Sequence, residues 1–187
     1  MRSPIQAEQI VVKDSIEGCS RKIVVAIVSL QPKGTPKSHT NLVALKDESP
    51  SSDNALAWAI KNILRSNDAL VLINVQPKSS LFSRQAEIDV SELILTIDER
   101  FRADSHQLLM DSIRKARILA PNAKIQALSL KGDPREVLLE EIEALDANAV
   151  VMGSRGLNKV KGVVFGSVST FLMRHVRACP VIVIKLE

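Results

Sequence analysis

Short, solid runs of apolar residues, rich in valine and isoleucine, recur along the chain and constrain its fold most. They lie at 22–30, 69–75, 149–152 and 180–185, and a further strand, interrupted by polar residues, is predicted near 124–130. Because the runs do not alternate with polar residues, they predict strands buried on both faces, as in a parallel sheet. Segments with helical spacing of apolar residues separate them, at 53–64, about 88–119, 134–145 and 167–177.

This alternation of strands and helices predicts an α/β fold. We expect a single doubly wound, five-stranded parallel sheet with helices on both faces, of the Rossmann-like kind. A length of 187 residues suits one such domain. Residues 1–20 are polar and lack clear periodicity, so they are predicted to be a flexible N-terminal tail, and residues 21–187 to form the domain.

Composition argues against several function classes. The net charge is only +4, its basic residues are scattered, and aromatic residues make up 3% of the chain, so we expect no nucleic-acid partner. No apolar run approaches the roughly 20 residues of a membrane span, and the N-terminus does not read as a secretory signal. Cys19 and Cys179 form no Cys-x-x-Cys pair. We expect a reduced protein of the cytoplasm, with the nucleus left open.

A glycine-bearing loop follows the fourth predicted strand. Gly153 and Gly156 come directly after the strand, and Gly166 opens the next helix. In a doubly wound sheet ligands bind beyond the carboxyl ends of the strands, and a helix N-terminus attracts anions. The neighbouring donors and charges are Ser167, Ser169, Arg155, Lys159 and Lys161. On position and composition alone, the loop fits a phosphate cradle or a plain strand-to-helix connection.

The spacing of these glycines resembles the ATP-binding signature of the universal stress protein family, and similarity extends over about residues 22–186. The resemblance implies an adenine nucleotide alpha hydrolase-like fold that binds ATP, with or without Mg²⁺. It also implies a regulatory, stress-response role through nucleotide-dependent conformation or dimerisation, with a homodimer formed through residues 181–185. A weak ATP-hydrolysing enzyme of the same fold group remains an alternative.

The resemblance also assigns the binding residues. Gly153 and Gly156 would contact ribose and phosphates, and the backbone of Val75 and the carboxylate of Asp47 would lie near the adenine. Met152 and Arg155 belong to the same candidate set. The β and γ phosphates would be held by Gly166, Ser167, Val168 and Ser169. No catalytic residue and no metal ligand are assigned.

The chain departs from the family pattern at about residues 28–46, which separate the first predicted strand from Asp47. This segment is interpreted as an inserted loop, since lengthening a loop changes stability little. A retained intron and a strand exchange, in which residues 42–45 replace the first strand, are the alternatives. An insertion here predicts weakened ATP binding, and in the extreme a structural dimer that has lost ATP.

Overall fold

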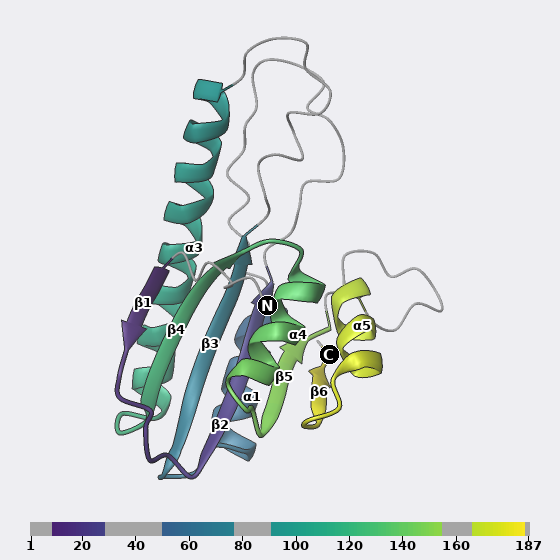
Figure 1. Cartoon of the computed structure of the whole chain (residues 1–187). Coiled ribbons are helices and arrows are strands. Elements are labelled where there is room, and N and C mark those ends of the chain that lie inside the picture. Colours follow the sequence, from purple (N-terminus) through teal and green to yellow (C-terminus); the bar gives the residue numbers. More distant parts are fainter. Residues whose placement is uncertain (1–8, 29–49, 77–90, 155–165, 186–187) are drawn as a thin grey trace.

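The computed structural model describes residues 9–28, 50–76, 91–154 and 166–185, which build one sheet covered by helices (Figure 1). Its strands are β1 (Gln9–Lys13), β2 (Arg21–Val28), β3 (Asp68–Gln76), β4 (Lys124–Lys131), β5 (Ala149–Gly153) and β6 (Val181–Ile184). Its helices are α1 (Pro50–Asn62), α3 (Ser91–Leu119), α4 (Pro134–Ala144) and α5 (Ser167–His175).

The strands lie in the order β1-β4-β3-β2-β5-β6. The neighbours from β4 to β6 pair in parallel, which confirms the predicted five-stranded parallel sheet. Residues 21–28 occupy its centre, so the strand-exchange alternative is wrong for this structure; residues 42–45 lie outside the described residues.

The N-terminal region corrects the sequence prediction. Residues 9–13 form β1, which pairs antiparallel with β4 and makes a sixth strand, so the expected flexible tail over 1–20 is wrong there. Asp14 anchors the end of β1: its carboxylate accepts hydrogen bonds from the backbone N–H of Ile125 at 2.9 Å and from the guanidinium of Arg117 at 2.5 Å. β1 therefore covers the outer edge of β4, which would otherwise be a free edge.

Two apolar clusters hold the layers together. Alternate residues of each central strand point to opposite faces, so Leu70 and Leu72 of β3 face α1 and α3, whereas Val71 and Ile73 face α4 and α5. These residues are fully buried. Burial on both faces explains why the strands read as unbroken apolar runs.

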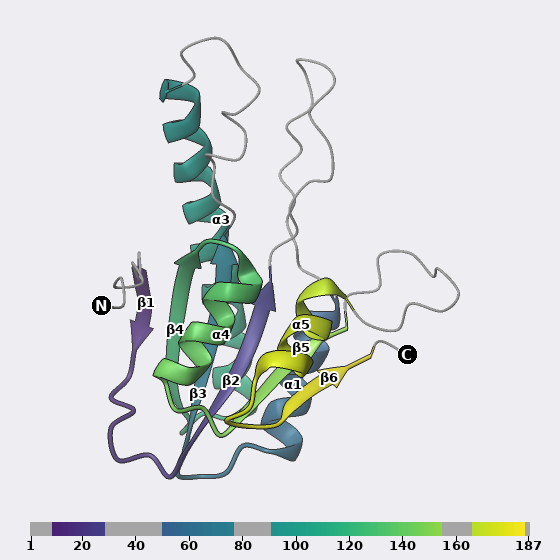
Figure 2. The ribbon, with the colours of Figure 1, turned by 45° about the vertical axis from the view of Figure 1, so that its right-hand side comes forward.

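The order in which successive strands are added to the sheet reverses at β2. The chain adds β3 and β4 on one side of β2 and then β5 and β6 on the other, so the switch point lies between β2 and β5. Ligands of open α/β sheets bind at the carboxyl ends of the strands flanking such a point. α1 and α5 lie on opposite faces of the sheet at this place and begin near that edge (Figure 2).

Candidate functional site

The end of β5 is packed tightly against the start of α1. A Cβ atom on Gly153 would lie 2.0 Å from Oγ and 2.6 Å from the carbonyl oxygen of Ser51, and Ser51 is 3% exposed. No side chain fits there without moving the backbone of α1. Packing alone therefore requires glycine at the first position of the predicted signature.

Gly166 is under no such constraint from the described residues. It is the N-cap of α5 with φ −70° and ψ 165°, a conformation open to any residue, and its nearest described contact for an added Cβ is Ser169 Oγ at 3.7 Å. The N-cap makes no side-chain hydrogen bond to the helix. Among the described residues, no side chain therefore caps the backbone N–H groups of the first turn, Ser167 to Ser169.

The two serines of this turn differ. Ser167 is exposed, so its hydroxyl is accessible at the helix start. Ser169 is buried, and its hydroxyl donates to the carbonyl oxygen of Gly166 at 2.9 Å. In this conformation Ser167 offers a hydroxyl to an anion, whereas Ser169 offers its backbone N–H.

The remaining predicted residues fall into two groups. Val75 and Met152 are buried in the apolar cluster that also holds Leu172 of α5, so their side chains form part of the core beneath the edge. Asp47, Arg155 and Gly156 lie outside the described residues. Val168, on the first turn of α5, packs partly buried against the same cluster.

Sequence reasoning missed a set of polar residues on the other face of the sheet, near the same edge. Asn74 and Gln76, at the end of β3, are buried, and both take part in hydrogen bonds to serine side chains. Two polar residues at alternating positions, in an otherwise apolar run, were the available signal.

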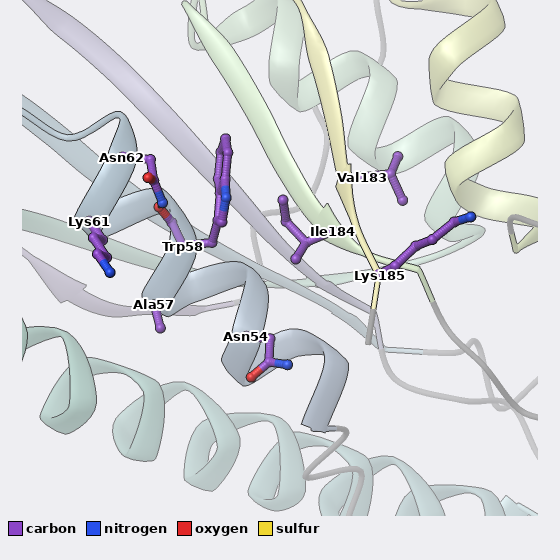
Figure 3. A pocket seen from close by; sticks show the side chains of 8 residues that line it. All are labelled: Asn54, Ala57, Trp58, Lys61, Asn62, Val183, Ile184 and Lys185. Atoms are coloured by element: carbon purple, nitrogen blue, oxygen red, sulfur yellow. The ribbon is translucent and has the colours of Figure 1, made fainter. Parts of the chain in front are cut away.

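A separate groove of about 930 Å³ lies between α1 and the edge strand β6 (Figure 3). Trp58 of α1 and Ile184 of β6 stand beside each other in it, and both pack against the core. Its other lining residues are Asn54, Ala57, Lys61, Asn62, Val183 and Lys185. The groove follows the outer edge of the sheet and is a candidate contact surface beside β6.

Three features of the described residues bear on other functions. Within them, no group of three or more histidine, cysteine, aspartate or glutamate side chains is arranged to hold a metal ion. None of the described helices combines the length and apolar character needed to cross a bilayer. The pKa of the Cys179 thiol is raised by burial, which favours the neutral, less reactive form of this side chain.

Comparison with known sequences finds the same family that the spacing of the glycines resembles. The model of the universal stress protein family matches residues 39–185, a range that starts after β2. Universal stress protein PHOS32 of Arabidopsis thaliana is 32% identical over 167 residues, which cover 82% of this chain and 68% of that protein.

Solved structures share the fold. A universal stress protein family protein from Arabidopsis thaliana with AMP bound has a TM-score of 0.57 at 23% identity, covering 89% of this chain and 92% of that one. A universal stress protein in complex with cAMP has a TM-score of 0.56 at 21% identity, covering 89% and 97%. At sequence identities this low, the two matches show that the fold is similar and nothing further.

Proposed function

The chain belongs to the universal stress protein family, and from that premise we propose that it binds ATP at the carboxyl edge of its sheet. The observation that carries the proposal is the start of α5, where no described side chain caps the first N–H groups and the nearest described contact of a Cβ on Gly166 is 3.7 Å away. The AMP and cAMP found with proteins of the same fold support an adenine nucleotide as the ligand.

The phosphates are assigned to the first turn of α5. Backbone N–H groups of Ser167, Val168 and Ser169, together with the partial positive charge of the helix N-terminus, favour an anion there. The exposed Ser167 hydroxyl adds a donor. Since these groups suit distal phosphates, ATP should bind more tightly than AMP. Mg²⁺ would be held mainly by the phosphates themselves.

The adenine is assigned to the backbone of Val75. The carbonyl oxygen of the next residue, Gln76, accepts a hydrogen bond from the N–H of Gly132, on the β4 side of β3. Successive residues of a strand turn their backbone groups to opposite sides. The N–H and C=O of Val75 therefore face β2, where Val75 pairs with Val28 in the parallel ladder, so the adenine would reach Val75 only at the end of this pairing.

We propose binding rather than turnover as the activity. The described candidate residues offer backbone N–H groups, serine hydroxyls and apolar side chains, none of which is a general base at neutral pH. The consequence of binding would then be regulatory, through nucleotide-dependent conformation or self-association. ATP hydrolysis above background, abolished by a substitution in the first turn of α5, would contradict this part of the proposal.

We further propose that two copies pair through β6. The N–H of Val150 donates to the carbonyl of Pro180, and the N–H of Ser154 donates to that of Ile184, so alternate residues of β6 face β5. The backbone groups of Val181 and Val183 consequently face the open edge, where a second strand can add. The groove beside Trp58 would be shielded by the same contact.

The central test uses the full chain and the variant Gly166→Val. Mass spectrometry identifies any nucleotide that co-purifies, and calorimetry then measures ATP and AMP affinity after its removal. The proposal expects an adenine nucleotide, tighter binding of ATP than of AMP, and near-complete loss of ATP binding in Gly166→Val at a similar thermal midpoint. Unchanged ATP affinity in this variant would overturn the assignment of the phosphates to α5.

A further inference from the structure

The groove between α1 and β6 borders an open strand edge. In the part of the chain that the structure describes, β6 is the outermost strand on its side of the sheet, next to β5. The carbonyl groups of Pro180 and Ile184 accept hydrogen bonds from β5, so the backbone groups of Val181 and Val183 face the open side. Such an edge can accept an added strand through main-chain hydrogen bonds.

Apolar side chains occupy the middle of this groove. Trp58 and Ile184 stand beside each other there (Figure 3), and both are only partly buried although they pack against the core. A strand added to β6 can therefore bury more of their apolar surface without displacing them from the core. This arrangement favours an occupant whose central residues are apolar.

The two ends of the groove are basic. None of its eight lining residues is acidic, and two of them are the exposed lysines Lys61 and Lys185. α1 begins near the carboxyl edge of the sheet, where β6 ends, so the two elements run in opposite directions (Figure 2). Lys61, near the end of α1, and Lys185, just after β6, therefore lie toward opposite ends of the groove.

A second copy of the chain does not neutralise these charges. Two copies that pair through the same strand are related by a two-fold axis, so their β6 strands run antiparallel. The partner's Lys185 then comes to the end of the groove where Lys61 lies. Like charges in such positions weaken association at low ionic strength. Self-pairing thus fills the apolar centre of the groove and leaves repulsion at both ends.

We propose that the β6 edge and this groove also bind an extended segment of another protein, with apolar residues at its centre and an acidic residue at each end. The segment adds to β6 as a strand, covers Trp58 and Ile184, and places its carboxylates near Lys61 and Lys185. It competes with a second copy for the same edge. Nucleotide binding is not required, because α1 and β6 form the groove without the phosphate site at α5.

The test uses two end-blocked, fluorescently labelled peptides with the same alternating valine–isoleucine centre. One has glutamate at both ends and the other has lysine. Fluorescence anisotropy measures their affinity for the full chain. We expect the acidic peptide to bind about ten-fold more tightly at low ionic strength, the combined effect of several exposed charge pairs. The preference should vanish near ~1 M salt, where the Debye length is about 3 Å.

Equal affinity for the two peptides at low ionic strength, or no binding of the acidic peptide, would overturn the inference. So would unchanged binding of the acidic peptide by Val183→Pro, which removes an outward-facing N–H of β6.

A charge reversal locates the contact in the groove. Lys61→Glu should abolish the preference for the acidic peptide, and Lys124→Glu is the matched control. Lys124 is equally exposed, but it begins β4, which is separated from β6 by three strands. The control should keep the ten-fold preference. Equal effects of the two variants would indicate attraction to the whole basic chain and would refute the groove as the site.

Salt dependence separates this inference from the proposed pairing of two copies. Light scattering should show that self-association strengthens as the salt concentration rises, whereas binding of the acidic peptide weakens. At low ionic strength the acidic peptide should dissociate the dimer, and a dimer that stays intact with peptide bound would contradict a shared edge. If the wild type is a monomer, the proposed pairing fails, and the two peptide affinities still decide the inference.

Discussion

Ser51 and Gly153 meet at the point where the start of α1 crosses the end of β5, so closely that a Cβ on Gly153 would lie 2.0 Å from Ser51 Oγ. The contact fixes the beginning of α1 against the switch point of the sheet. A glycine that resembles part of a nucleotide signature is thus also required by the fold. The two glycines of the signature that the structure describes, Gly153 and Gly166, therefore have separable roles.

Gly153→Ala should destabilise the protein by about 1–3 kcal/mol, because the new methyl group overpacks a site closed by backbone as well as side-chain atoms. Thermal or denaturant unfolding measures the loss. Gly166→Ala is the matched control, since the nearest described contact of its Cβ is 3.7 Å away, and its stability should change by less than about 0.5 kcal/mol. Equal stability of the two variants would contradict the packing role of Gly153.

Asp14→Ala should release β1 from the edge of β4. The backbone N–H of Ile125, and next the guanidinium of Arg117, hold the pKa of Asp14 below its ordinary value of 3.8. A lowered pKa in the folded protein means that this carboxylate stabilises the fold above about pH 4 and ceases to do so as the pH falls through its folded pKa. Hydrogen exchange should therefore show loss of protection in Gln9–Lys13 at neutral pH.

The control for Asp14→Ala is Asp53→Ala, which removes a more exposed ion pair with Lys115. Its effect on stability should be at most about 1 kcal/mol, with β1 protection unchanged. The difference in stability between wild type and Asp14→Ala should shrink below the folded pKa of Asp14. At such pH values the carboxyl group is neutral in both the folded and the unfolded protein. A difference that persists unchanged there would exclude the carboxylate as the anchor.

Val183→Pro should produce a monomer where the wild type is a dimer at micromolar concentration. The N–H of Val183 faces the open edge, so proline removes a donor for the second copy and leaves the hydrogen bonds between β5 and β6 in place. Light scattering measures the mass. Fluorescence of Trp58, the one tryptophan of the chain, reports on burial beside β6. A monomeric wild type would refute the proposed pairing.

Deleting residues 29–45 should strengthen ATP binding by about ten-fold, if Asp47 then accepts a hydrogen bond from the nucleotide. The deletion joins Val28, the last residue of β2, to Lys46. Asp47 then follows shortly after the carboxyl end of β2, one of the two strands that flank the switch point. If the segment is the inserted loop that the sequence predicts, the thermal midpoint should stay similar or rise, since shortening a loop changes closure entropy little. Weaker binding or unfolding of the variant would show that the segment is an integral part of the domain.

Much of the fold was determined by the sequence itself. Unbroken apolar runs identify strands buried on both faces, and the helical segments between them require parallel pairing. The helical segment predicted over 134–145 matches α4, and local chemistry explains where the helix starts: Asp133 caps it, accepting from the N–H of Arg135 at 2.9 Å, and Pro134 is its first residue. Such features depend on neighbours in sequence, so periodicity and capping chemistry are sufficient to predict them.

Tertiary structure alone decided the rest. β1 is short and lacks a distinctive pattern, and it forms because β4 offers an edge more than a hundred positions away, as in the bond of Asp14 to Ile125, 111 residues apart. The hydrogen bond of Asn74 to Ser105 spans 31 positions, and the contact of Gly153 with Ser51 joins segments separated by most of the domain. These relationships arise from packing between elements, which local propensity does not encode.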